Sequence, residues 1–245
     1  MSEPILALRG VTVRFGGVTA VSGVDLEVRA GETVGLIGPN GAGKTTLFNV
    51  ITGTVRPQAG SVRLRGERID GLRPSQIARR GLRRTYQIVR PFPQLSLVDN
   101  VLIGGMFGGE KGPRGGDLRG RALDLLATVG LADKAAMLAR DLNLAEKKKL
   151  DLARALAANP AVLLLDEVLA GLNPTEIDRS LDLLERIQRD QGKTIMMVEH
   201  VMRAIMRISR RVVVLHHGEK IADGQPEAVA RDPRVIEAYL GEPIA

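Results

Sequence analysis

One eight-residue stretch constrains this chain more than any other, because it has the pattern of a loop that binds phosphate. It has the form G-x-x-x-x-G-K-[ST] and consists of Gly38, Pro39, Asn40, Gly41, Ala42, Gly43, Lys44 and Thr45. A short apolar run precedes the stretch and a helix-like run follows it, which is the context that such a loop requires. We therefore expect a buried strand, a tight glycine-rich turn and a helix, in that order.

Each part of this stretch suits a bound triphosphate. Glycine lets the backbone curl so that several N–H groups point at one anion, and the start of the helix adds the positive end of its dipole. We expect Lys44 to reach the β- and γ-phosphates and the Thr45 hydroxyl to bind Mg²⁺. The other loop residues and Thr46 complete the expected nucleotide contacts. A glycine-rich turn with an incidental lysine explains the pattern less well.

Four apolar runs predict the sheet that carries this loop. Residues 33–37, 162–165, 194–198 and 212–215 are short and almost continuously apolar, which is typical of parallel strands buried on both faces. Ligands of such a sheet bind beyond the carboxyl ends of its strands. We therefore expect an α/β core of the P-loop NTPase class with its site at that edge.

Two other regions differ from this core. Residues 6–28 alternate between apolar and polar side chains, which predicts an N-terminal subdomain of antiparallel β-strands. Residues 117–158 are largely helical in pattern, so we expect the stretch 88–158 to be an inserted α-helical subdomain. Its run from Gly104 to Gly116 holds seven glycines and is expected to be a surface loop. The expected organisation is a single domain, 1–245, whose nucleotide-binding core consists of residues 1–87 and 159–245.

Composition restricts the classes of function. The 245 residues include no cysteine, which excludes disulfides and thiolate metal sites. The sequence has no apolar run of about 18 residues that could span a bilayer, and its N-terminus does not resemble a secretory signal, so we expect a cytoplasmic protein. The net charge of +7 would suit nucleic acid, an anionic membrane surface or phosphate ligands. With four Phe, two Tyr and no Trp there is little aromatic surface for stacking bases, so an arginine-rich solvated surface explains the charge at least as well.

A pair of carboxylates ends the second apolar run. Asp166 and Glu167 follow residues 162–165 directly, and a buried charge needs a compensating partner. Mg²⁺ beside the phosphate loop would be the partner of Asp166. Glu167 is expected to face the other way along the pleat, where it could orient or deprotonate an attacking water. An isolated Asp-Glu pair would more simply be a strand-end turn, but together with a phosphate loop the catalytic interpretation is favoured.

With these motifs the chain resembles the ABC-type ATPases over nearly its whole length. The resemblance implies ATP as the nucleotide and adds three residues to the expected site. Phe15, which by itself would suit a core position, corresponds to the aromatic residue that stacks on adenine. Gln87 corresponds to the glutamine that contacts the metal and the lytic water, and His200 corresponds to the histidine that reaches the γ-phosphate. The expected catalytic residues are Glu167, His200, Gln87 and Lys44, and the expected metal ligands are Thr45, Gln87 and Asp166.

The chain departs from this family in the segment that caps the nucleotide of a partner ATPase. Family members usually have Leu-Ser-Gly-Gly-Gln there, whereas this chain has Leu142-Asn143-Leu144-Ala145-Glu146. Asn143 can still cap a helix and donate a hydrogen bond to phosphate. Replacing both glycines adds Cβ atoms where the backbone should approach the γ-phosphate. In such a pair of ATPases, this segment and the partner's phosphate loop together form one composite nucleotide site. We expect that composite site to be weakened, while the site built on Lys44 of this chain stays intact.

A finer resemblance, to the ATPases of branched-chain amino acid importers, rests on residues 84–93, the Gly171-Leu172-Asn173-Pro174 loop and residues 232–241. It implies two integral membrane permease subunits, a second ABC ATPase that is a different chain, and a periplasmic substrate-binding protein as an indirect partner. It also implies a peripheral position on the cytoplasmic face of the inner membrane. Related ATPases serve urea or short amides, and a close cousin drives lipopolysaccharide export, so the cargo and the direction of transport stay open at this point.

Two functions of other classes are weaker alternatives. Soluble ABC ATPases that act on nucleic acid or ribosomes usually have two ATPase units or large insertions, and this chain has one unit and no heptad run, so we expect no nucleic acid partner. A nucleotide-binding regulator without turnover is disfavoured because Glu167 and His200 are both present.

Overall fold

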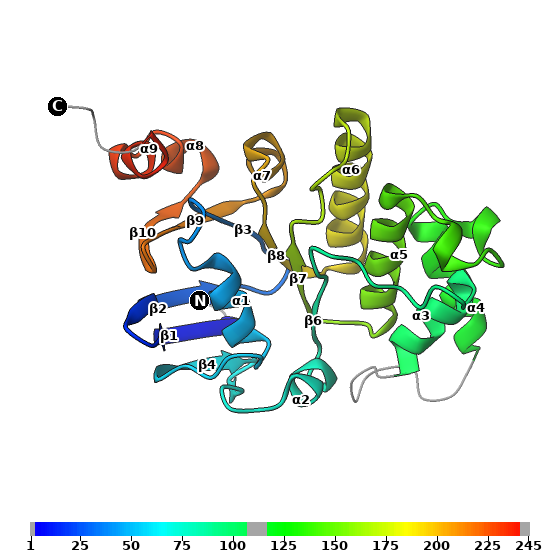
Figure 1. Cartoon of the computed structure of the whole chain (residues 1–245), viewed down its shortest axis with the longest axis horizontal. Coiled ribbons are helices and arrows are strands. Elements are labelled where there is room, and N and C mark those ends of the chain that lie inside the picture. The colour runs from blue at the N-terminus through cyan, green and yellow to red at the C-terminus, as the bar shows by residue number, and fades with distance from the viewer. Residues whose placement is uncertain (1–2, 107–116, 241–245) are drawn as a thin grey trace.

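A mostly parallel sheet at the centre of the molecule carries the phosphate loop (Figure 1). The structure is a computed structural model, and it describes residues 3–106 and 117–240. The sheet has the order β10-β9-β3-β8-β7-β6 and consists of β3 (Thr33–Ile37), β6 (Leu82–Arg84), β7 (Val162–Asp166), β8 (Thr194–Val198), β9 (Arg211–His216) and β10 (Glu219–Gly224). The strands from β9 to β6 pair in parallel, and only β10 is antiparallel to its neighbour. The four strands predicted from apolar runs are therefore confirmed.

A smaller antiparallel sheet packs against one face of this core. Its strands lie in the order β2-β1-β4-β5, with the bounds β1 (Leu6–Phe15), β2 (Val18–Val28), β4 (Ala59–Leu64) and β5 (Glu67–Arg68). The pairing of β1 with β2 confirms the antiparallel strands expected from residues 6–28, and β4 and β5 extend that sheet from a later part of the chain. A backbone hydrogen bond of 2.9 Å from Ser22 to Gly218 joins the two sheets.

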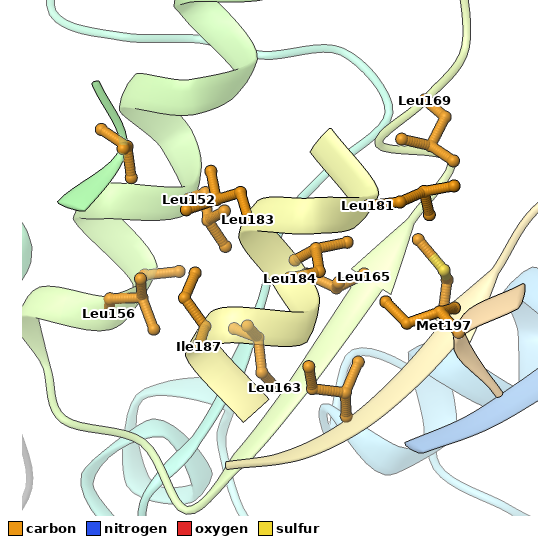
Figure 2. Packing of buried hydrophobic residues seen from close by; sticks show 14 of the residues in the cluster. Leu152, Leu156, Leu163, Leu165, Leu169, Leu181, Leu183, Leu184, Ile187 and Met197 are labelled. Atoms are coloured by element: carbon orange, nitrogen blue, oxygen red, sulfur yellow. The ribbon is translucent and has the colours of Figure 1, made fainter. Parts of the chain in front are cut away.

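Alternate side chains of the central strands face two separate hydrophobic clusters. Val162 and Leu164 of β7 point toward the small sheet and helix α1 (Lys44–Ile51). Leu163 and Leu165 point the other way, toward α5 (Leu144–Ala157) and α6 (Pro174–Gln191), as Figure 2 shows. Both faces of the strand are thus covered, which explains why residues 162–165 are apolar at every position. Each such side chain contributes roughly 1.5–3 kcal/mol on burial.

The inserted helices lie together at one side of the sheet (Figure 1). They are α3 (Leu97–Met106), α4 (Leu118–Thr128) and α5, with the short 3₁₀ turns Ala132–Lys134 and Ala139–Asp141 between the last two. The other helices are α2 (Pro74–Arg79), α7 (Met202–Ile208), α8 (Pro226–Val229) and α9 (Pro233–Leu240). Within residues 3–106 and 117–240, no helix has the length and apolar character needed to cross a bilayer.

The glycine-rich run corrects one expectation. Gly104 and Gly105 do not belong to a loop, because they lie in the last turn of α3. A Cβ atom at Gly104 would stand 2.5 Å from the carbonyl oxygen of Arg154 in α5, so this glycine permits a close approach of two helices. Composition alone could not distinguish a close helix contact from a loop. The rest of the expected loop, residues 107–116, lies outside the described residues.

Candidate active site

The phosphate loop has a backbone that only glycine fits at its two ends. Gly38 has φ 149° and Gly43 has φ 102°, both in the region that disfavours side chains. A Cβ atom would also clash with the carbonyl oxygen of Leu215 at the first position and with that of Ala20 at the second. Pro39 to Ala42 form the turn between them, and α1 starts at Lys44, so Thr45 and Thr46 lie in its first turn. The predicted strand, loop and helix are confirmed.

Lys44 is folded back onto the loop that precedes it. Its ammonium group donates hydrogen bonds to the carbonyl oxygens of Gly38 at 2.6 Å and Pro39 at 2.9 Å. Burial lowers the pKa of Lys44, while the negative charges of Glu167 and Asp166 act in the opposite direction. The lysine therefore lies near both carboxylates that end β7, and its charge is available to an incoming phosphate.

The backbone turns sharply between the two carboxylates. Strand β7 ends at Asp166, and Glu167 has φ 49°, a left-handed conformation that costs a residue with a side chain about 1–3 kcal/mol. The sequence suggested that the alternation of a β-strand sets the direction of the Glu167 side chain. That expectation is wrong, because the direction comes from this left-handed turn. A hydrogen bond of 2.9 Å from the Glu167 N–H to the Val198 carbonyl oxygen fixes the turn against β8.

Two residues that are far apart in the sequence, Gln87 and His200, meet at the Glu167 carboxylate. The Gln87 amide donates to Glu167 Oε2 at 2.6 Å, and His200 Nε2 lies 3.1 Å from Glu167 Oε1. The Glu167 side chain is 17% exposed and that of His200 is 48% exposed, so the cluster opens to solvent at one side. A carboxylate held by an amide and an imidazole can orient a water molecule and accept its proton.

The expected metal ligands share one cavity. Thr45, Gln87 and Asp166 line a cavity of about 770 Å³, and their hydroxyl, amide and carboxylate oxygens are donors that suit Mg²⁺. Among the described residues, no cluster of three or more His, Cys, Asp or Glu side chains could hold a metal by itself. The residues thus fit a Mg²⁺ ion that keeps several waters and phosphate oxygens as ligands.

Two further residues of the expected site lie apart from this cluster. Phe15 ends β1 with 53% of its surface exposed, so it is not a core residue. Asn143 is the N-cap of α5, as predicted: its side chain accepts a hydrogen bond from the Glu146 N–H at 2.9 Å. The Glu146 side chain accepts in turn from the Asn143 N–H and forms an ion pair with Lys134. In the described part of the chain, no hydrogen bond joins Asn143 to the phosphate loop.

Two ionisable side chains that were not predicted from the sequence, Glu199 and Lys148, hold the catalytic turn. The buried Glu199 carboxylate accepts hydrogen bonds from the backbone N–H groups of Leu169, at 2.7 Å, and of His200. It therefore links the turn after Glu167 to the segment that carries the histidine. Burial is the largest cause that raises the pKa of Glu199, to about 7. Lys148 of α5 donates to the Glu167 carbonyl oxygen at 3.1 Å, which ties the same turn to the inserted helices.

A signal for Glu199 was present in the sequence. A carboxylate that directly follows the apolar run 194–198 needs a partner for the same reason as Asp166 does after 162–165. Lys148 gave no comparable signal, because one lysine in a run of three is indistinguishable from a solvated surface.

Arg84 is the third residue that the sequence analysis left without a role. It ends the short strand β6, whose register places Arg84 beside Leu164 of β7. Its guanidinium group donates to Asp166 Oδ2 at 2.5 Å and to Asn49 Oδ1 at 2.7 Å. The Arg84 and Asp166 side chains are only 5% and 7% exposed, so the ion pair is buried.

Comparison with protein families agrees with the nucleotide-binding site that this geometry indicates. A family model described as "ABC transporter" matches residues 21–170. A second model, described as "Branched-chain amino acid ATP-binding cassette transporter", matches residues 219–245. The first match covers more than half of the chain and includes the phosphate loop, Gln87, Asp166 and Glu167.

Individual proteins are similar over the whole length. The chain is 41% identical to the high-affinity branched-chain amino acid transport ATP-binding protein LivG of Escherichia coli (strain K12), covering 99% of this chain and 100% of LivG. It is 40% identical to BraF of Pseudomonas aeruginosa, with the same coverage. The crystal structure of the ADP conformation of MJ1267, an ATP-binding cassette of an ABC transporter, is 28% identical and superposes with a TM-score of 0.89 over 98% of this chain and 100% of that chain. The chain therefore belongs to the ABC transporter family, as an ATP-hydrolysing cassette of the type represented by LivG and BraF.

Proposed function

We propose that this chain is the energy-coupling subunit of an importer for branched-chain amino acids, and that the residues around Glu167 carry its ATP hydrolysis. The observation that carries the proposal is the meeting of Gln87, Glu167 and His200 beside the phosphate loop. The cargo is inferred from LivG and BraF, which are branched-chain amino acid transport proteins similar over the whole length, and from the family model that matches residues 219–245. In this proposal the permease subunits and the periplasmic binding protein select the cargo.

The chemistry of this site is mostly positioning and charge stabilisation. Glu167 orients the attacking water and accepts its proton, while Gln87 and His200 fix the carboxylate in place. Lys44 leaves the loop carbonyls for the β- and γ-phosphates when nucleotide enters. Thr45, Gln87 and Asp166 would hold Mg²⁺, which when bound would neutralise the charge that develops on the phosphate oxygens. His200 reaches the γ-phosphate from the carboxyl end of β8.

A second ABC ATPase, a different chain, completes each nucleotide site. The Lys44 loop of one subunit faces the start of the signature helix of the other, and Phe15 stacks on adenine from the exposed end of β1. Asn143 of this chain caps the nucleotide bound by the partner. Residues 88–158 therefore act as the signature subdomain, and residues 1–87 and 159–245 act as the nucleotide-binding core.

The segment 86–92 is the surface that contacts a permease subunit. Tyr86, Ile88 and Phe92 are exposed and line the same cavity as Gln87. The Tyr86 N–H donates to the Asp151 carboxylate of α5, whose pKa is raised chiefly by burial, and the Arg154 guanidinium lies 5.4 Å from the centre of the Phe92 ring. A protein that presses on this segment therefore acts on Gln87 and on α5 together. In this proposal the chain lies peripherally on the cytoplasmic face of the inner membrane, with two permease subunits and, indirectly, a periplasmic binding protein as partners.

Reconstitution tests the proposal. The chain is expressed with its permease subunits and second ATPase, purified as a complex and placed in proteoliposomes with ATP and the binding protein. Uptake of radiolabelled leucine is expected, and Lys44→Ala should abolish it without releasing the chain from the complex. Failure to copurify with membrane subunits, together with salt-sensitive binding to RNA or DNA, would refute the importer assignment.

A further inference from the structure

We propose that Arg84 is an internal counter-cation for Asp166 that keeps free divalent cations out of the site until nucleotide arrives. The inference deepens the proposed function and rests on the assignment of Asp166 as a metal ligand. Arg84 is a positioning residue, because it acts through Asp166 and is assigned no contact with the reacting atoms.

The contacts of Arg84 hold its charge in one place. One terminal nitrogen donates to Asp166 Oδ2 at 2.5 Å, and the other donates to Asn49 Oδ1 on α1 at 2.7 Å. The guanidinium carbon lies 5.5 Å from the centre of the Phe48 ring and 5.0 Å from that of Tyr86, so two aromatic rings flank the cation. A guanidinium that contacts four residues of the site has little freedom to move away from Asp166.

The charges around Asp166 explain why a free metal ion is excluded. Arg84 forms a buried ion pair with Asp166, and Lys44 carries a second positive charge close enough to interact with the same carboxylate. A divalent cation that enters without nucleotide approaches the positive charges of both Arg84 and Lys44. These charges lie in a site with little exposure to solvent, where like charges repel strongly. A nucleoside triphosphate brings negatively charged phosphates, and these attract both Lys44 and the metal ion.

The arrangement therefore makes metal binding conditional on nucleotide. It also places Arg84 three residues before Gln87, at the start of the segment proposed to contact a permease. Strand β6 is short, and Arg84 is its last residue, so the anchor lies where the core sheet ends and that segment begins.

Binding of Mn²⁺ to the nucleotide-free full-length chain, measured by electron paramagnetic resonance, tests the inference. Arg84→Met removes the charge and keeps an apolar stem between Phe48 and Tyr86. Arg84→Lys keeps the charge and serves as the matched control, and Arg84→Met/Asp166→Asn removes the carboxylate as well. We expect Arg84→Met to bind one Mn²⁺ about tenfold or more tightly than the unmodified chain. Arg84→Lys should stay near the unmodified value, and the double variant should lose the gain.

Two results would overturn the inference: an Mn²⁺ affinity of Arg84→Met no higher than that of the unmodified chain, or a gain that survives in the double variant. Arg84→Gln, which can keep the hydrogen bond to Asn49, replaces Arg84→Met if the latter does not fold. Mn²⁺ binding by Asp166→Asn in the presence of ADP separates the role of Asp166 as a metal ligand from the role of Arg84. If that variant binds Mn²⁺ with ADP as well as the unmodified chain does, the metal assignment itself is wrong. If it binds more weakly while Arg84→Met gains nothing, only the role of Arg84 is refuted.

Discussion

At the scale of single residues, the conformation of Glu167 depends on groups that are not themselves catalytic. Its φ of 49° is unfavourable for a side-chain-bearing residue, so surrounding contacts must hold it. Val198 accepts from its N–H, Lys148 donates to its carbonyl oxygen, and Glu199 accepts from the N–H of Leu169. The turn that carries Glu167 is thus held by hydrogen bonds with Val198 at the end of β8, with Glu199 directly after it and with Lys148 of α5.

Glu199 makes the stability of the chain depend on pH in a specific direction. Its pKa rises from 4.5 to about 7 on folding because of burial, and the charges that face it are those of Lys148 and Glu167. Between these two pH values the unfolded chain loses the proton while the folded chain keeps it, so this group's contribution to stability is lost as pH rises. The decrease in the free energy of unfolding is about 3 kcal/mol.

We therefore expect Glu199→Gln to make the free energy of unfolding less dependent on pH over that interval. Chemical denaturation at several pH values measures the free energy of unfolding. Glu219→Gln, which changes an exposed glutamate of β10, is the control. An unchanged pH dependence in Glu199→Gln would show that folding does not raise the pKa of this carboxylate.

At the scale of elements, the inserted helices depend on one close contact. Gly104 of α3 faces the Arg154 carbonyl of α5, and a Cβ atom there would lie at 2.5 Å. Gly105, its neighbour, is different: its Cβ atom would have no neighbour closer than the Ala157 carbonyl oxygen at 3.4 Å. Two adjacent glycines of one helix thus have opposite tolerance for a methyl group.

We expect Gly104→Ala to lower the free energy of unfolding by about 1–3 kcal/mol, because it forces α3 away from α5. Gly105→Ala should be neutral or stabilising by up to about 1 kcal/mol, because alanine favours a helix more than glycine does. Thermal unfolding of the two variants side by side measures the difference. Equal stabilities would mean that α3 and α5 can separate at no cost.

The elements also show what the sequence could and could not predict. The strands around the site were predictable, because four apolar runs between helical stretches leave few other arrangements. Strand β6 was not, because it has only three residues and two of them are arginines. Gly104 looked like part of a loop because a run of glycines dominates its surroundings. The Arg84–Asp166 pair depends on the order of strands in the sheet, which local sequence does not contain.

At the scale of the whole molecule, the segment 142–146 is the part of this chain that we propose meets the nucleotide of the partner ATPase. Leu144 is 49% exposed at the start of α5, and Glu146 takes the N3 position of the capping box with a carboxylate. A side chain and a negative charge therefore stand where glycines and a glutamine usually face phosphate. The two composite sites of the assembled ATPase pair are expected to differ.

We expect nucleotide trapping in the assembled transporter to show slower hydrolysis at the site capped by Asn143 than at the site built on Lys44. The double change Leu144→Gly/Ala145→Gly should raise hydrolysis at the slower site, because it lets the backbone approach the γ-phosphate. Equal hydrolysis at both sites of the unmodified complex would count against this asymmetry.

The most direct test of the account is the single-turnover rate of ATP hydrolysis by the assembled transporter with Glu167→Gln in this chain. Glutamine keeps the size of the side chain but cannot accept a proton, so we predict that ATP still binds and that hydrolysis at the Lys44 site falls by about 10²- to 10⁴-fold. Glu219→Gln should hydrolyse like the unmodified complex. Hydrolysis at the Lys44 site that continues at its normal rate in Glu167→Gln would contradict the assignment of Glu167 as the residue that acts on the attacking water.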